Sequence, residues 1–141
     1  MAIPSLSRAL YAFLSTYPPL TALIGTRLYP GLAPTSSPFP YLTMQDLMVA
    51  SHYHLDGATA TFDSMVQLDV WALEALEAQK IARTIRLAMD GMPAAWDGLE
   101  VDGVFVESEL DAPEPAQDGS ERAYYRRILT LTVWHLREVP A

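Results

Sequence analysis

The stretch Met65–Met92, MVQLDVWALEALEAQKIARTIRLAMDGM, changes its hydrophobic period once along its length. In its first part apolar and polar residues alternate, which predicts a strand over Met65–Ala72 because successive strand side chains point to opposite faces. From Ala78 onward apolar residues recur at spacings of three and four, which predicts a helix that ends near Gly91 and Pro93. A strand that passes directly into a helix is therefore the centre of the predicted fold.

The N-terminal part predicts one amphipathic helix followed by irregular chain. Apolar residues within Ser5–Tyr17 form a single stripe, and Pro18-Pro19 ends the helix because proline has no N–H to donate. Leu20–Ile24 allows one further short turn, closed by glycine. The prolines and glycine between Thr26 and Pro40 exclude a central strand or a helix there.

Three further segments have the alternation of strands: Phe39–Gln45, Leu99–Leu110 and Tyr124–Arg137. The intervening stretch Asp46–Thr61 holds either a second strand that leads into a loop or a loop alone. The last strand carries apolar residues on both faces, so one face is expected in the core and the other at a neighbouring subunit. His135 lies among its core residues and is expected to be a hydrogen-bonded core or interface residue rather than a catalyst.

These elements predict a single α+β domain over residues 1–141 with the order α-β-(β)-β-α-β-β. Consecutive strands with short connections favour antiparallel pairing, and the helices then cover one face of the sheet. We therefore expect a mainly antiparallel sheet of about four to five strands packed by two helices.

The charge distribution argues against a surface that grips nucleic acid. The formal net charge is −8, and the segment from Asp97 to Glu121 holds nine acidic residues and no lysine or arginine. Phosphate binding needs clustered cations, so the simplest interpretation of this segment is a solvated acidic hairpin. No apolar run reaches the length of about 20 residues that a membrane-spanning helix requires. The N-terminus lacks the cationic start of a signal peptide, and we expect synthesis in the cytoplasm.

The sequence offers little for catalysis. It has no cysteine and no G-x-S-x-G or glycine-rich phosphate motif. His52 and His54 are two apart, so on a strand both could hold a metal together with Asp46 or Asp56, but no third ligand has a defined spacing. We therefore expect no enzyme, no catalytic residue, no metal and no cofactor. A small metal-dependent enzyme that uses His52 and His54 is the less favoured alternative.

Three stretches together resemble the tail completion, or tail-to-head joining, family of tailed bacteriophages, whose members include tail terminators. They are Leu20–Gln45 with its I-G-x-R-hydrophobic-Y segment and following P-Y-L strand, Ser64–Met89 with the alternating strand that ends at Trp, and Tyr125–His135. Their order and spacing agree with the family over most of the chain. The region His52–Phe62 and the acidic connector after Leu110 depart from it.

The resemblance implies a compact α+β subunit that assembles with copies of itself into a ring, usually of six. Such a ring sits at the head-proximal end of the tail tube, ends tube growth and presents a docking surface to the head-tail connector or stopper protein. The expected partners are therefore other copies of the chain, the tail tube protein and the connector, with no membrane, in the tail or neck of a virion. A head-tail stopper, another minor tail protein and a monomeric binding module are the alternatives.

The resemblance carries over only fold or interface positions, namely Gly25, Arg27, Tyr29, Pro40 and Trp71. The candidate subunit-interface residues are Trp71, Asp69, Trp134 and Tyr29. DNA must pass the ring without specific binding, and an acidic segment that lines the lumen would repel its phosphates. The candidate lumen-facing residues are Glu107, Glu109, Asp111, Glu114, Asp118 and Glu121.

We predict that Trp71 lies at or near a subunit boundary, so that Trp71→Ala weakens assembly more than folding. Light scattering should show the loss of assembly under conditions in which the variant chain is still folded. A variant that unfolds as a monomer would place Trp71 in the core instead.

Overall fold

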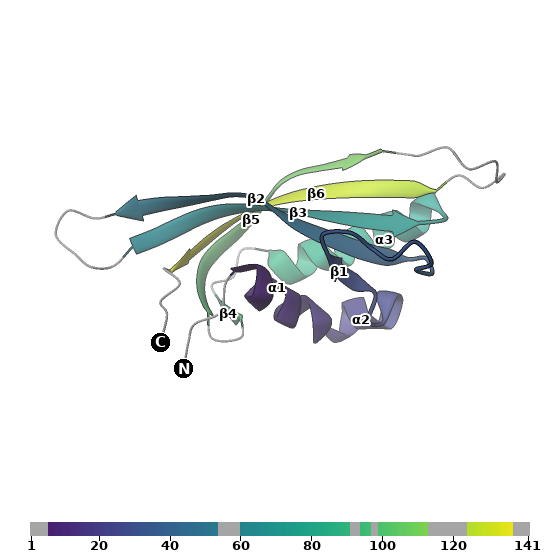
Figure 1. The fold of residues 1–141 in the computed structure, drawn as a ribbon, viewed down its shortest axis with the longest axis horizontal. Helices are drawn as coiled ribbons and strands as arrows, with labels where there is room; N and C mark the ends of the chain where they lie inside the picture. Colours follow the sequence, from purple (N-terminus) through teal and green to yellow (C-terminus); the bar gives the residue numbers. More distant parts are fainter. Residues whose placement is uncertain (1–5, 54–59, 91–93, 97–98, 113–123, 137–141) are drawn as a thin grey trace.

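One sheet with all its helices on a single face makes up the described part of the molecule (Figure 1). The computed structural model describes residues 6–53, 60–90, 94–96, 99–112 and 124–136. Within these ranges the elements are α1 (Leu6–Ser15), α2 (Pro18–Ile24), β1 (Leu28–Pro30), β2 (Tyr41–Tyr53), β3 (Ala60–Ala72), α3 (Ala75–Met89), β4 (Ala94–Trp96), β5 (Leu99–Asp111) and β6 (Tyr125–Leu136).

The sheet has the strand order β1-β2-β3-β6-β5-β4 among the residues described. Only β1 and β2 are parallel, and every other neighbouring pair is antiparallel. β3 and β6 are central and pair with each other over twelve positions, from Thr61 with Leu136 to Ala72 with Tyr125. The predicted α+β class, the antiparallel pairing and the order of the main elements are confirmed.

The period change at Ala72 produces β3 and α3 as predicted. Val66, Leu68 and Val70 are fully buried on the helix-covered face of β3. The stripe of α3 that faces the sheet is buried as well, and consists of Ala78, Ile81, Ala82, Ile85 and Met89. Packing these two apolar surfaces together forms the core, to which β6 adds Leu129, Leu131 and Val133.

The structure adds two short strands and a short helix to the prediction. β1 and β4 have three residues each and lie at the two edges of the sheet, where the Pro30 of β1 costs no ladder hydrogen bond to a further strand. The predicted strand Phe39–Gln45 and the uncertain strand after it form one element, β2. A register shift between Asp46 and Met48 interrupts the alternation there, and this resembles a strand end in the sequence.

Two of the positions carried over by the family resemblance have clear roles in the fold. Gly25 caps α2 with a φ of 61°, a left-handed conformation that favours glycine. Arg27 donates its Nε–H to the carbonyl oxygen of Pro40 at 2.8 Å, and its own carbonyl accepts from the amide of Leu42 at 2.9 Å. The I-G-x-R segment therefore turns the chain out of α2 and fastens β1 beside β2.

The core contains one buried polar pair on its β3 and β6 strands. Ser64 Oγ and His135 Nε2 are 2.8 Å apart, and both residues are buried. The predicted role of His135 as a hydrogen-bonded core residue is confirmed. None of the helices in the described ranges is long and apolar enough to cross a membrane.

We predict that Ile85→Ala, on the buried stripe of α3, lowers the free energy of unfolding by about 2–5 kcal/mol because it leaves a cavity in the core. Leu32→Ala is the control at a surface position, since Leu32 is 92% exposed, and should change the stability by less than about 0.5 kcal/mol. Urea unfolding of both variants measures the difference. Equal losses would contradict the position of α3 over the sheet.

Candidate interaction surface

The face of the sheet turned away from the helices, here called the open face, carries no helix in the described part of the chain (Figure 1). The register places its residues in rows across the strands. Tyr41 pairs with Trp71, which pairs with Arg126. The next row contains Thr43, Asp69, Ile128 and Leu110. This surface therefore carries aromatic, charged and apolar groups that no helix buries.

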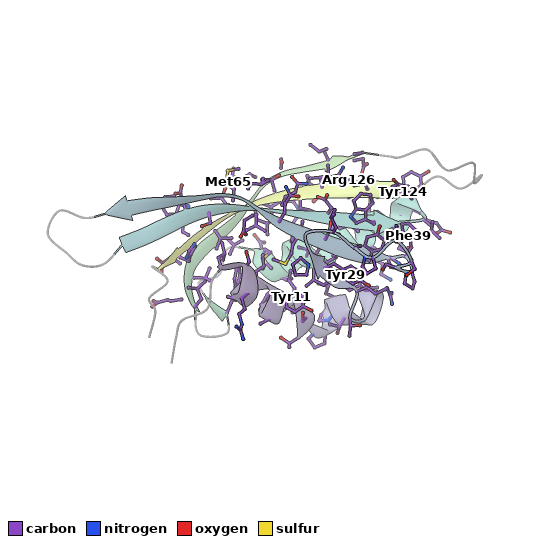
Figure 2. The ribbon with its side chains drawn as sticks, viewed as in Figure 1. Tyr11, Tyr29, Phe39, Met65, Tyr124 and Arg126 are labelled. Carbon is purple, nitrogen blue, oxygen red and sulfur yellow. The ribbon has the colours of Figure 1, made fainter. Side chains whose placement is uncertain are left out.

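Five aromatic rings gather at one end of the open face, and we call them the aromatic cluster: Tyr29, Phe39, Tyr41, Trp71 and Tyr124. The ring centroids of Tyr41 and Trp71 are 5.9 Å apart, nearly parallel, and Tyr124 lies 5.7 Å from Trp71. Figure 2 shows Tyr29, Phe39 and Tyr124 at this end of the molecule. Aromatic pairs at such distances stabilise beyond the area they bury. The cluster is therefore a cohesive unit within one chain.

Trp71 is the centre of the cluster. Its indole N–H donates to Thr43 Oγ1 at 3.0 Å, and the guanidinium of Arg126 lies 5.0 Å from its ring centroid. The side chain is only partly buried, so part of it faces outward from the open face. The pKa of the neighbouring Tyr41 is raised, first by burial and then by the adjacent Tyr124 and Tyr29 hydroxyls, which keeps this phenol neutral.

Asp69 holds Arg126 in place over Trp71. Arg126 donates from Nε at 3.0 Å and from a terminal nitrogen at 2.6 Å to the same carboxylate oxygen, and Gln67 donates to the other oxygen at 2.8 Å. The Asp69 residue is only 5% exposed. A charge this buried requires its partner. Asp69 therefore contributes to the surface by positioning Arg126.

Trp134 lies at the other end of the open face. It is eight residues from Arg126 along β6, which corresponds to about 26 Å. It pairs with Gly103, and the ring of Phe105 lies so close to Gly103 that an added Cβ would be 3.4 Å from it. With Asp102 these residues line a hollow of about 350 Å³, here called the Trp134 hollow. Phe105 is 53% and Trp134 is 36% exposed.

Of the predicted interface residues, the structure brings together Tyr29, Asp69 and Trp71, since Tyr29 reaches the cluster through its 6.0 Å contact with Tyr41. Trp134 belongs to a separate region. Sequence reasoning missed Arg126 and Tyr124. The signal that could have found them is the run Tyr-Tyr-Arg-Arg at residues 124–127, because it begins a predicted strand and the neighbouring strand carries the acidic Asp69.

The predicted lumen-facing acids do not share one environment. Glu107 is exposed. Glu109 accepts hydrogen bonds from Arg127 and Arg86 on the helix-covered side, and Asp111 accepts one from Arg127 at 2.6 Å. Burial alone would raise the pKa of Glu109, but the hydrogen bonds from Arg127 and Arg86 outweigh it and the pKa is lowered. Glu114, Asp118 and Glu121 lie outside the described residues.

The alternative metal site falls largely outside the described residues. His52 belongs to β2 opposite Thr61, its side chain is outside the described part, and His54 lies outside the described residues. Within the described ranges no group of three His, Asp or Glu side chains is arranged to hold a metal ion.

Comparison with known proteins identifies a family from the sequence and a similar fold among the solved structures. The sequence model of the family "Tail completion protein gp17" matches residues 8–136. A chain from the solved structure "Virion of native gene transfer agent (GTA) particle" superposes with a TM-score of 0.67 at 20% identity, over 94% of this chain and 96% of that chain. At this identity the likeness shows a shared fold. The curated proteins contain no match to the sequence.

We predict that Glu109→Gln lowers the free energy of unfolding by about 1–3 kcal/mol at pH 7, because charge-assisted hydrogen bonds from Arg127 and Arg86 are weakened. The pKa of Glu109 is lower in the folded chain than in the unfolded chain, so its contribution is present above the unfolded value and is lost as the pH falls through the folded one. Urea unfolding from pH 7 to pH 3 should show wild type and variant converging. A constant difference across that range would contradict the ion-pair role.

Proposed function

Because the chain belongs to the tail completion protein gp17 family, it is a structural protein of a virion tail, and we propose that it forms a ring that ends the tail tube. In this proposal about six copies close the head-proximal end of the tube and offer a docking surface to the head-tail connector. The observation that carries the proposal is the family match over residues 8–136, which includes every helix and strand from α2 to β6.

The surface chemistry supports self-association. A ring needs a heterologous interface, in which one patch meets a different patch on the next copy. The open face carries two unlike regions, the aromatic cluster and the Trp134 hollow, at opposite ends of β6, and each has the chemistry of one of the two patches that such an interface needs. Aromatic residues and arginine are the groups most enriched at such interfaces. The arrangement supports a structural role rather than chemistry.

The proposal includes DNA that passes the lumen without binding. Exposed carboxylates repel phosphates, and Glu107 is the described acid of the predicted set that could do so, whereas Arg127 compensates part of the charge of Asp111. Glu109 contributes little, because two arginines compensate its charge. An electron-microscopy map of the assembled ring that places residues 107–111 on the outer rim would contradict this part of the proposal.

We predict that particles made without this chain have tail tubes of uncontrolled length that do not join heads. Electron microscopy of tails assembled with and without the chain measures the length distribution. In vitro, adding the purified chain to growing tail tube protein should stop elongation and leave one ring-shaped density at one tube end. Tubes of normal length that fail only to join heads would instead indicate a head-tail stopper.

A further inference from the structure

The outward face of α3 carries a second patch, which we call the α3 stripe: Leu76, Lys80, Arg83 and Leu87. These positions fall on one side of the helix at spacings of four, three and four, and the stripe is about 16 Å long. Leu76 is 77% and Leu87 is 62% exposed, and both cations are exposed too. Packing of the core does not explain why an exposed leucine stands at each end of a helix face that carries two cations.

The α3 stripe carries two exposed cations, although the molecule as a whole is acidic. The net charge is −8, with nine lysines and arginines in all. Arg86, Arg126 and Arg127 are engaged in ion pairs with Glu109, Asp69 and Asp111. Lys80 and Arg83 have no ion-pair partner among the described residues. They therefore offer attraction to an acidic surface outside their own chain.

The Trp134 hollow has the complementary properties. Its apolar lining is the rings of Phe105 and Trp134 beside Gly103, and it is a shallow depression of about 350 Å³ that is open to solvent. Exposed acids stand beside it, at Asp102 on the rim and at Glu100 two residues earlier on β5. Because Gly103 has no side chain, the space beside the Phe105 ring stays open.

We propose that the α3 stripe of one copy docks against the Trp134 hollow of the next copy, with Leu87 in the hollow and Arg83 facing Asp102. The order of groups agrees along both elements. On α3 the sequence Leu87, Arg83, Lys80 runs away from the leucine in steps of one turn. On β5 the hollow is followed by Asp102 and then Glu100, which would face Lys80. Charge and shape are complementary over three consecutive positions.

This interface rests on the proposed ring and identifies its contact surfaces. The stripe lies on the helix side of the molecule and the hollow lies on the open face of the sheet. Because the two patches differ and lie on opposite faces of the sheet, the proposed contact is heterologous, and each copy presents one unused patch after it has bound a neighbour through the other. Repetition of the contact then adds copies until the ring closes.

Two charge reversals test the interface. Arg83→Glu and Asp102→Lys are both at exposed positions, so both variants should fold with the wild-type urea midpoint. Each alone places like charges across the contact, and we expect a roughly tenfold or larger rise in the dissociation constant of self-association. Ser15→Glu combined with Ala22→Glu, at two exposed helix positions, changes the net charge by the same two units as Arg83→Glu and is the control, which should assemble as wild type does.

Mixing the two variants gives the decisive result. In a mixture, the carboxylate introduced by Arg83→Glu would face the ammonium introduced by Asp102→Lys at one contact. At the next contact the unchanged Arg83 would face the unchanged Asp102, so assembly should return to the wild-type level in light scattering. Asp102→Lys also makes the chain less negative, which by general charge repulsion alone would favour association. Loss of assembly by that variant is therefore specific to the proposed contact.

Cysteine cross-linking gives an independent readout, since the chain has no cysteine of its own. Leu87→Cys combined with Phe105→Cys should form a ladder of disulfide-linked multimers under oxidation. Tyr11→Cys combined with Phe105→Cys is the matched control and should form none above dimers. A wild-type oligomer whose charge variants assemble normally and whose Leu87–Phe105 pair gives no ladder contradicts the interface alone. A wild-type chain that stays monomeric even beside growing tail tubes contradicts the ring and the interface together.

Discussion

β3 can bury only one of its faces inside its own chain, because side chains alternate along a strand and all the described helices lie on one side of the sheet. The helix-covered face is filled by Val66, Leu68 and Val70. The other face must therefore be stable without a covering layer. The aromatic cluster and the Asp69–Arg126 pair meet this constraint. Contacts between the rings and the nearly buried ion pair stabilise the open face, as packing against the helices stabilises the other face.

Periodicity predicted the parts of the fold whose side chains face one apolar core. The change of period after Ala72 identified β3 and α3, and the alternation around Leu129 and Val133 identified β6. β1 and β4 were missed because three residues are too few to show a period. The bulge in β2 was missed because an extra residue reverses the alternation, and a pattern of that kind also occurs at strand ends.

The sequence predicted the fold better than it predicted the candidate interaction surface. Tyr29, Asp69 and Trp71 were recognised as surface candidates, but their association depends on contacts between residues far apart in the chain. Arg126 is 57 positions from Asp69, and only the register of β3 with β6 brings the two together. Likewise, the charges of Glu109 and Asp111 seemed unopposed along the sequence, whereas the fold brings Arg86 and Arg127 to them.

An acidic chain that assembles with itself must overcome its own net charge, and this limits where its copies can meet. Among the described residues, Arg86, Arg126 and Arg127 are engaged with acids of the same chain. Lys80 and Arg83 on α3 are exposed and have no ion-pair partner in those ranges, so they can attract an acidic neighbour. The proposed contact from the α3 stripe to the Trp134 hollow does not favour a two-fold dimer, because the two patches lie on opposite faces of the sheet and such a dimer would have to join both pairs at once. The charge distribution and the one-sided covering of the sheet therefore both agree with the proposed head-to-tail assembly. Head-to-tail contacts of this kind close into a ring when the rotation between neighbours closes, and the ring proposed above is such a closed cycle.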